Sequence, residues 1–199
     1  MNKRLKPIMF VGTCSDAGKS VINAAFCRIF KQDGYHPAPF KAQNMSLNSY
    51  STPEGGEMGR AQVVQAEACG IAPHTDMNPV LLKPTNDKSS QVVLNGRPVG
   101  NMSARDYFGM QNRKEELFEE AVEAFHRLES RYSPIVLEGA GSISELNLRD
   151  RDITNMRMAE RAGAATFLVQ PPRHLCLQQK LAWHRSSRSR CPGKCSNTC

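Results

Sequence analysis

Residues 12–20 have the sequence Gly-Thr-Cys-Ser-Asp-Ala-Gly-Lys-Ser and stand between the apolar run Ile8-Met9-Phe10-Val11 and a helical pattern. This order predicts a strand, a glycine-bounded loop and a helix that begins with Lys19 and Ser20. Glycines allow successive backbone N–H groups to point into the loop, and a helix N-terminus adds positive potential. The stretch therefore predicts a phosphate-binding loop, and this loop decides the fold class.

The loop is one residue longer than the usual G-x4-G-K-[ST] pattern, because five residues separate Gly12 from Gly18. We expect Lys19 to contact the β- and γ-phosphates of ATP and the Ser20 hydroxyl to ligate Mg²⁺. Asp16 is a weaker candidate that could also serve only as a turn cap. The predicted nucleotide-binding residues are Gly12, Thr13, Asp16, Gly18, Lys19 and Ser20.

Strands and helices alternate along the rest of the chain. The patterns predict strands at 8–11, 36–40, 80–83, 91–94, 135–138 and 165–169, and helices at 19–33, 58–69, 103–129 and 153–162. Two helical stripes are expected to be apolar faces: Ile22, Ala25, Phe26 and Ile29, and Leu117, Ala121, Ala124, Phe125 and Leu128. The alternation predicts an α/β fold, a P-loop three-layer sandwich with a mainly parallel but incomplete sheet and helices on both faces.

Ligands of such sheets bind at the carboxyl ends of the strands. Lys41 and Glu138 each follow or end a predicted strand, so both are expected near the loop. Glu138 could complete Mg²⁺ coordination beside Ser20, and Lys41 could stabilise charge on a transferring phosphoryl group. The polar stretch 42–57 is too long for a simple connector and predicts a functional loop. Its Glu57 is a weaker metal candidate, so the predicted metal ligands are Ser20, Glu57 and Glu138.

Charge and apolar content exclude some functions. The net charge of +7 comes mostly from residues 170–199, which hold six of the 26 basic residues and none of the 19 acidic ones. The remainder is nearly neutral, so we expect no nucleic-acid partner. The apolar runs are far too short to span a bilayer, so we expect no membrane partner, and scattered cysteines predict the cytoplasm.

The sequence pattern changes after residue 169. Residues 1–169 are expected to form the P-loop domain, whereas residues 170–199 form a basic, cysteine-rich tail without usable periodicity, expected to be disordered. An acid-free tail beside a balanced domain indicates a different reading frame or an unfolded extension. We hypothesise a frameshift near codon 170.

The chain resembles the cobyric acid synthases from about residue 7 to residue 169. The residues that carry the resemblance are the loop 12–20, Pro-Phe-Lys-Ala-Gln-Asn-Met-Ser-Leu-Asn-Ser at 39–49, Gly-Gly-Glu-Met-Gly-Arg-Ala-Gln at 55–62, Asp-Met-Asn-Pro-Val-Leu-Leu-Lys-Pro at 76–84, Glu-Gly-Ala-Gly-Ser at 138–142 and Asn-Leu-Arg-Asp-Arg-Asp-Ile-Thr-Asn-Met at 147–156. A generic P-loop ATPase lacks the long Asn-rich loop.

The resemblance implies ATP- and glutamine-dependent amidation of the b, d, e and g carboxylates of adenosylcobyrinic acid a,c-diamide in cobalamin biosynthesis. It implies an acyl phosphate intermediate, activation of Mg-ATP by Lys19, Lys41 and Glu138 as catalytic residues, and a corrinoid substrate. The same resemblance implies that Ser20 also helps to bind and activate Mg-ATP, and that Glu57 and the 43–49 loop lie near the metal or the corrinoid.

The chain departs from the family pattern at Gln170-Pro171-Pro172, where an Asp-Ile-Asp-Arg-Gly-Gly-like stretch is expected. We therefore expect the rest of the synthetase sheet and the C-terminal glutaminase domain to be absent, with ammonia coming from a glutaminase domain missing here. Poor stability and little amidation are expected of the isolated chain. The alternatives are an inactive truncated fragment, a ParA/MinD-like P-loop ATPase, or another synthetase, namely dethiobiotin synthetase or cobyrinic acid a,c-diamide synthase.

Overall fold

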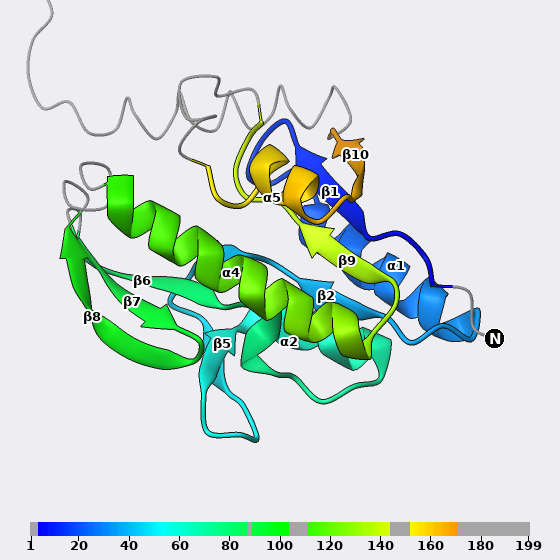
Figure 1. Ribbon diagram of the computed structural model, residues 1–199, viewed down its shortest axis with the longest axis horizontal. Helices are drawn as coiled ribbons and strands as arrows, with labels where there is room; N and C mark the ends of the chain where they lie inside the picture. Colours follow the sequence, from blue (N-terminus) through cyan, green and yellow to red (C-terminus); the bar gives the residue numbers. More distant parts are fainter. Residues whose placement is uncertain (1–3, 87–88, 104–110, 144–151, 171–199) are drawn as a thin grey trace, which may run out of the picture.

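The computed structural model describes residues 4–86, 89–103, 111–143 and 152–170. Its central feature is a four-stranded parallel sheet in the order β10-β1-β9-β2 (Figure 1). The strands are β1 (Ile8–Gly12), β2 (Ala38–Phe40), β9 (Ile135–Glu138) and β10 (Ala165–Val169). All strands run in one direction, so their carboxyl ends lie along one edge of the sheet. The predicted α/β class with a parallel sheet is confirmed.

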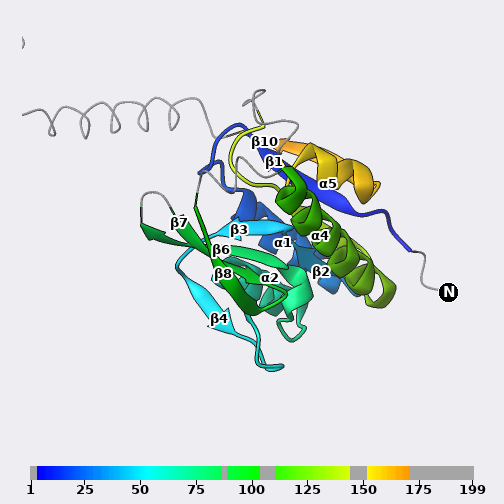
Figure 2. The same cartoon turned by 60° about the vertical axis from the view of Figure 1, so that its left-hand side comes forward.

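Helices cover both faces of this sheet (Figures 1 and 2). Alternate strand residues point to opposite faces. Met9, Ile135 and Leu137 belong to a core that they share with α4 (Gln111–Arg131) and α5 (Met156–Arg161). Phe10 and Val136 belong to a second cluster, together with buried cysteines of α1 (Lys19–Gln32) and α2 (Arg60–Cys69). The arrangement is the expected three-layer sandwich.

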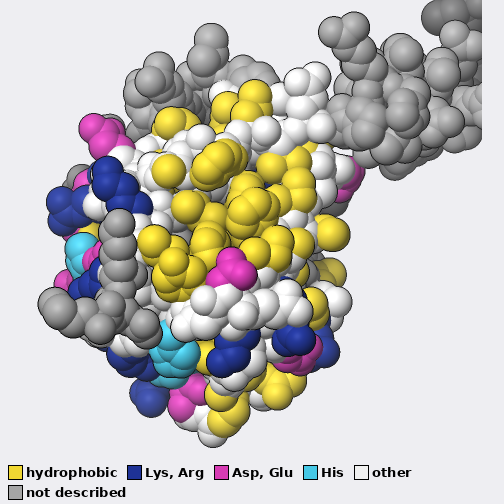
Figure 3. All heavy atoms as spheres, turned by 90° about the vertical axis from the view of Figure 1, so that its right-hand side faces the viewer, with side chains coloured by type: hydrophobic (Ala, Val, Ile, Leu, Met, Phe, Trp, Pro, Cys, Tyr) yellow, Lys and Arg dark blue, Asp and Glu magenta, His cyan; other side chains and the backbone are white. Residues whose placement is uncertain are grey.

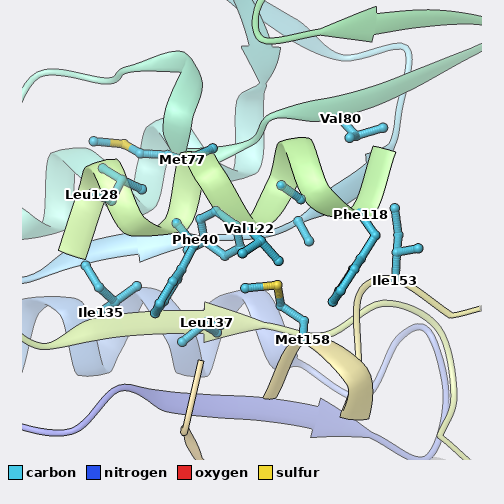
Figure 4. Packing of buried hydrophobic residues seen from close by; sticks show 14 of the residues in the cluster. Phe40, Met77, Val80, Phe118, Val122, Leu128, Ile135, Leu137, Ile153 and Met158 are labelled. Atoms are coloured by element: carbon cyan, nitrogen blue, oxygen red, sulfur yellow. The ribbon is translucent and has the colours of Figure 1, made fainter. Parts of the chain in front are cut away.

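Helix α4 buries the predicted stripe. Leu117, Ala121, Ala124, Phe125 and Leu128 are all buried. Phe125 meets Phe40 of β2 edge to face, at 5.5 Å between ring centroids. Figure 4 shows Phe118 and Val122 of the same helix beside Leu137 and Met158. Each fully buried side chain of this size contributes about 1.5–3 kcal/mol relative to exposure, so α4 is a main source of stability.

The stripe predicted for α1 is wrong at three of its four positions, whereas Ile22 is partly buried against the second cluster as predicted. Ala25, Phe26 and Ile29 are exposed, whereas Asn23 and Cys27 are completely buried. The physical reason is that α1 packs with α2 beside it and turns its Asn23 face to β9, where the Asn23 amide donates to the Val136 carbonyl over 3.3 Å. A polar side chain can be buried when it has such a partner.

A second, mixed sheet follows β2, in the order β3-β6-β7-β8. Its strands are β3 (Gln43–Met45), β6 (Val80–Asn86), β7 (Ser89–Leu94) and β8 (Arg97–Ser103), and a separate pair joins β4 (Ser49–Ser51) to β5 (Glu57–Gly59). A short 3-10 helix, η1 (Thr75–Met77), precedes β6. The chain passes from one sheet to the other at Lys41, whose backbone N–H donates to the Met77 carbonyl.

Three predictions for this region and α5 need correction. The stretch 42–57 holds short strands rather than only loop, Ser103 ends strand β8 instead of beginning the helix predicted at 103–129, whose residues 104–110 lie outside the described ones, and the helix predicted at 153–162 spans only Met156–Arg161. Strand pairing explains the first two: β3 pairs with the distant β6, β4 pairs with β5, and β8 pairs with β7 across the Asn95-Gly96 turn. The turn predicted at Asn95-Gly96 is confirmed, with positive φ at both residues.

Strand β10 pairs with β1. Among the described residues, no strand pairs with the other edge of β10. Phe167 and Leu168 of β10 are more than half exposed, and Phe26 and Ile29 of α1 are exposed as well. Figure 3 shows hydrophobic side chains gathered on this side of the molecule, where β10 and α1 lie. A contiguous exposed apolar surface of this kind is a self-association liability.

Across the described ranges, no helix has both the length and the apolarity needed to cross a bilayer. The predictions for most of the tail, residues 171–199, and for residues 147–151 of the family motif lie outside the described residues.

Candidate nucleotide-binding site

Three strand ends meet beside the glycine-bounded loop. Strand β1 ends at Gly12, β9 ends at Glu138, and Lys41 directly follows β2. These strands are neighbours in the parallel sheet, so the three positions share its carboxyl edge. This is the edge where open α/β sheets bind ligands, as the sequence predicted.

Glu138 is the centre of the contacts at this edge. Its Oε1 accepts a hydrogen bond from Ser20 Oγ at 2.8 Å and another from Lys41 Nζ at 2.8 Å. Glu138 is only 2% exposed and Lys41 9%. Breaking such a buried ion pair leaves an uncompensated charge, so the two side chains depend on each other for their burial. The structure thus brings three of the predicted site residues together.

The Lys19 side chain is buried against the loop instead of extending into solvent. Its Nζ donates to the carbonyl oxygens of Cys14 at 2.7 Å, Gly141 at 2.9 Å and Ser15 at 3.3 Å. Burial lowers the pKa of Lys19, although the nearby Glu138 opposes this shift. The three carbonyls hold the ammonium where anionic phosphate oxygens could replace them.

Two glycines of the loop are required for different reasons, close packing at Gly12 and backbone conformation at Gly18. A Cβ at Gly12 would lie 2.8 Å from Lys19 Nζ, and Gly18 has a φ of +92° at the N-terminus of α1. A side chain at Gly12 would displace the lysine, and one at Gly18 would be strained. These are physical reasons for the glycine pattern in the sequence.

The other predicted loop residues have more modest contacts. Thr13 accepts a 2.7 Å hydrogen bond from Ser142 Oγ on its carbonyl oxygen, and its N–H donates to the Val169 carbonyl at 3.2 Å. The loop is therefore tied to the ends of β9 and β10. Asp16 is exposed and contributes its negative charge near Lys19.

Glu57, the third predicted metal ligand, has its contacts elsewhere. Its Oε1 accepts from Lys83 Nζ at 2.5 Å and from Ser49 Oγ. Burial alone would raise the pKa of Glu57, but the hydrogen bonds from Lys83 and Ser49 outweigh it and lower the pKa. The structure places Glu57 with the second sheet and the β4–β5 pair, whereas Ser20 and Glu138 contact each other directly.

Two glutamines of α2 complete the site, and sequence reasoning missed both. The second oxygen of Glu138, Oε2, accepts from Gln65 Nε2 at 2.6 Å, and Gln62 Nε2 lies 3.5 Å away. Both glutamines are buried, at 1% and 0% exposure. The signal in the sequence was two amides three residues apart on one face of a predicted helix.

Asn155 holds the loop that follows Glu138. Its side-chain amide donates to the Ala140 carbonyl at 2.8 Å, and its Oδ1 accepts from the Ala140 N–H at 3.0 Å. A Cβ at Gly139 would overlap Asn155 Oδ1. Sequence reasoning quoted this asparagine within the 147–156 motif without assigning it this role.

The donor set fits a hard divalent cation. Ser20 Oγ and Glu138 Oε1 are oxygen atoms that meet at 2.8 Å, and Gln65 Oε1 is a buried oxygen without a hydrogen-bond partner among the described residues. No group of three or more His, Cys, Asp or Glu side chains able to hold a metal occurs in the described part of the chain. Mg²⁺ typically takes one or two protein oxygens and completes its shell with phosphates and water.

The parallel sheet, the glycine-bounded loop and the Ser20–Glu138 contact define a P-loop nucleotide-binding α/β protein. A comparison with protein families agrees with this class. The family described as the CobQ/CobB/MinD/ParA nucleotide binding domain matches residues 8–170, and the chain belongs to that family.

The chain is also similar to curated proteins that are named cobyric acid synthase. The chain is 88% identical over 169 residues to the cobyric acid synthase of Parabacteroides distasonis, 67% identical over 169 residues to that of Bacteroides fragilis, and 62% identical over 166 residues to that of Syntrophobacter fumaroxidans. These alignments cover 83–85% of this chain but 32–34% of the relatives. The chain thus spans about a third of the length of the curated relatives it matches.

Proposed function

We propose that this chain is the ATP-binding, acid-activating part of a cobyric acid synthase, a ligase of cobalamin biosynthesis. The single observation that carries the proposal is the convergence of Ser20 and Lys41 on Oε1 of Glu138, at 2.8 Å each, next to the P-loop. The names and the identities of the curated relatives support the choice of this family member.

The proposed reaction converts a carboxylate to an amide. A carboxylate oxygen of adenosylcobyrinic acid a,c-diamide attacks the γ-phosphorus of ATP, forming an acyl phosphate and releasing ADP. Ammonia then attacks the acyl carbon, the C–O bond to phosphate breaks, and inorganic phosphate leaves. The b, d, e and g carboxylates are the proposed acceptors. The ATP is consumed because a free carboxylate is a poor electrophile.

Each residue has a proposed role. Lys19 exchanges its three carbonyl partners for β- and γ-phosphate oxygens, and Gly12, Thr13 and Gly18 shape the loop around them. Ser20 and Glu138 hold Mg²⁺, which when bound neutralises phosphate charge. Lys41 forms an ion pair with Glu138 and stabilises negative charge on the phosphoryl group that is transferred. Glu57, paired with Lys83, is proposed to face the corrinoid side of the site rather than the metal.

The proposed division of the chain keeps residues 1–169 as the synthetase domain. We propose that ammonia is supplied by glutamine hydrolysis at a glutaminase unit outside the aligned residues. The curated relatives extend well beyond the aligned third, which leaves room for such a unit. We place the reaction in the cytoplasm, where free thiols such as those of Cys14, Cys27 and Cys69 persist.

The test combines nucleotide binding with amidation from free ammonium. The chain should bind ATP in the presence of Mg²⁺, measured by calorimetry, and the corrinoid diamide should accelerate ADP release and yield a low level of amidated corrinoid, detected by mass spectrometry, in keeping with the little amidation expected of the isolated chain. Ammonium replaces glutamine, so a glutaminase is not needed. Nucleotide-driven dimerisation without any response to the corrinoid would contradict the proposal and favour a ParA/MinD-like ATPase. Nucleotide binding with neither response would favour an inactive fragment.

A further inference from the structure

The two oxygens of Glu138 have different partners. Oε1 faces Ser20 and Lys41, at the edge where the nucleotide is proposed to bind. Oε2 faces helix α2, where Gln65 Nε2 donates to it at 2.6 Å. Gln65 therefore holds one oxygen of the carboxylate, while the other oxygen contacts Ser20 and Lys41.

The orientation of the Gln65 amide follows from this contact. An ionised carboxylate only accepts hydrogen bonds, so Gln65 must turn its NH₂ group toward Oε2. The same nitrogen lies 3.4 Å from the backbone carbonyl of Ser20. Gln65 thus contacts both proposed metal ligands, the side chain of one and the backbone of the other.

The remaining atom of the amide is unusual. Gln65 is 1% exposed, yet its Oε1 is buried and without a hydrogen-bond partner among the described residues. A buried unpaired carbonyl oxygen is costly and is rare in native proteins. Gln62 differs, because its Oε1 accepts a 3.1 Å hydrogen bond from Asn44. Gln62, the neighbouring buried glutamine, has both ends of its amide paired.

We propose that Gln65 is a positioning residue for the divalent cation. Its N–H group fixes Glu138 so that Oε1 stays turned toward Ser20, and its free Oε1 accepts a hydrogen bond from a water molecule of the hydrated cation. This inference rests on the proposed metal role of Ser20 and Glu138. It adds a residue on α2 that orders the metal ligands without being one of them.

The experiment compares Gln65→Met with the matched variant Gln62→Met, which changes a neighbouring buried glutamine on the same helix in the same way. ATP affinity is measured by calorimetry with Mg²⁺ and, separately, with EDTA, and Mn²⁺ binding to the ATP complex is followed by electron paramagnetic resonance. We expect Gln65→Met to weaken metal-dependent ATP binding about tenfold or more, as loss of an outer partner does at metal sites. ATP affinity in EDTA should stay within about twofold, and Gln62→Met should have the smaller effect on metal binding.

Gln65→Asn, which withdraws the same amide by one methylene, gives a second variant if Gln65→Met does not fold. It should show the same loss confined to the metal-dependent measurement. Equal losses with Mg²⁺ and with EDTA would show a packing role and overturn the inference, as would unchanged Mn²⁺ binding. A wild-type affinity that is independent of metal would also overturn it. The failure of amidation alone would contradict the proposed function while leaving this inference standing.

Discussion

Ser20 Oγ lies 2.8 Å from Glu138 Oε1, although 118 residues separate the two in sequence. Ser20 lies in the first turn of α1 and Glu138 ends β9, so the contact ties the phosphate loop to a neighbouring strand end. Lys41 shares the same oxygen. The polar groups of the site are thus arranged by the fold itself, which is the preorganisation that electrostatic catalysis requires.

Replacing Lys19 should weaken ATP binding without unfolding the protein. A hydrogen bond to a charged group contributes about 1.5–3 kcal/mol, which corresponds to about ten- to a hundredfold in affinity. We expect Lys19→Met to lose at least the lower figure, measured by calorimetry with Mg-ATP. Lys31→Met, at the exposed end of the same helix, is the control and should bind normally. Equal affinities for the two variants would contradict the assignment of Lys19.

The Lys41–Glu138 pair should show strong coupling in a double-mutant cycle. Removing one partner leaves the other charge buried, at a cost of about 3–5 kcal/mol. Lys41→Met and Glu138→Gln should each destabilise the protein by about this amount in urea unfolding. The double variant should be much less destabilised than the sum of the two. Simple additivity would mean that the pair is not coupled as the 2.8 Å contact implies.

Gly139→Ala should destabilise the loop after β9. The added Cβ would overlap Asn155 Oδ1, so the asparagine would have to release its two hydrogen bonds to Ala140. Leaving these partly buried backbone groups unpaired costs up to about 1–3 kcal/mol, which thermal or urea unfolding would measure. Gly141→Ala is a useful comparison, since no atom lies within 4 Å of its added Cβ although its φ is +57°. A Gly139→Ala variant as stable as the wild type would contradict the importance of the Asn155 contact, because Gly139, unlike Gly141, has no positive φ that an alanine would strain.

The apolar surface of β10 and α1 should cause self-association. Phe167 is 51% exposed and Ile29 45% exposed on this side of the molecule. Lysine on an edge strand prevents strand addition by other chains. We expect Phe167→Lys combined with Ile29→Lys to lower the weight-average mass in sedimentation velocity across a concentration series. Val64→Lys, at an equally exposed position on α2, should change little; the same reduction with Val64→Lys would point to net charge instead.

The Lys83–Glu57 ion pair should make stability depend on pH in the acidic range. The pKa of Glu57 is lower than the ordinary value of 4.5, so its contribution is present above that value and is lost as pH falls through the folded pKa. The difference in unfolding free energy between wild type and Glu57→Gln should be about 0.2–1 kcal/mol near neutrality and vanish in acid. A difference that persists unchanged well below pH 4 would show that the charge of Glu57 is not its source.

Local patterns predicted the elements that carry the loop. Strand β1, helix α1 and strand β9 lie within a residue or two of their expected bounds, because each has an apolar pattern and an evident end signal. The positions of Lys41 and Glu138 followed from one general rule about parallel strands, and the structure brings both to Ser20. Their roles toward a nucleotide stay predictions.

Other predictions from the sequence failed where the structure depends on contacts between residues that are distant in the sequence. The face of α1 was misjudged because burial of Asn23 depends on the Val136 carbonyl, more than a hundred residues away. The second sheet was missed in part because β3 is a three-residue polar strand whose hydrogen bonds come from the distant strand β6. Gln65 was overlooked for the same reason, since its partner Glu138 lies on another element.

The sequence by itself determined the phosphate loop, the parallel α/β class and the resemblance to the cobyric acid synthases, since these depend on residue type and short spacing. The tertiary structure alone decided that Gln65 supports Glu138, that Lys19 lies on three carbonyl oxygens, and that Glu57 pairs with Lys83. The physical reason is that a buried polar side chain takes the partner that the packing of distant elements places within hydrogen-bond reach.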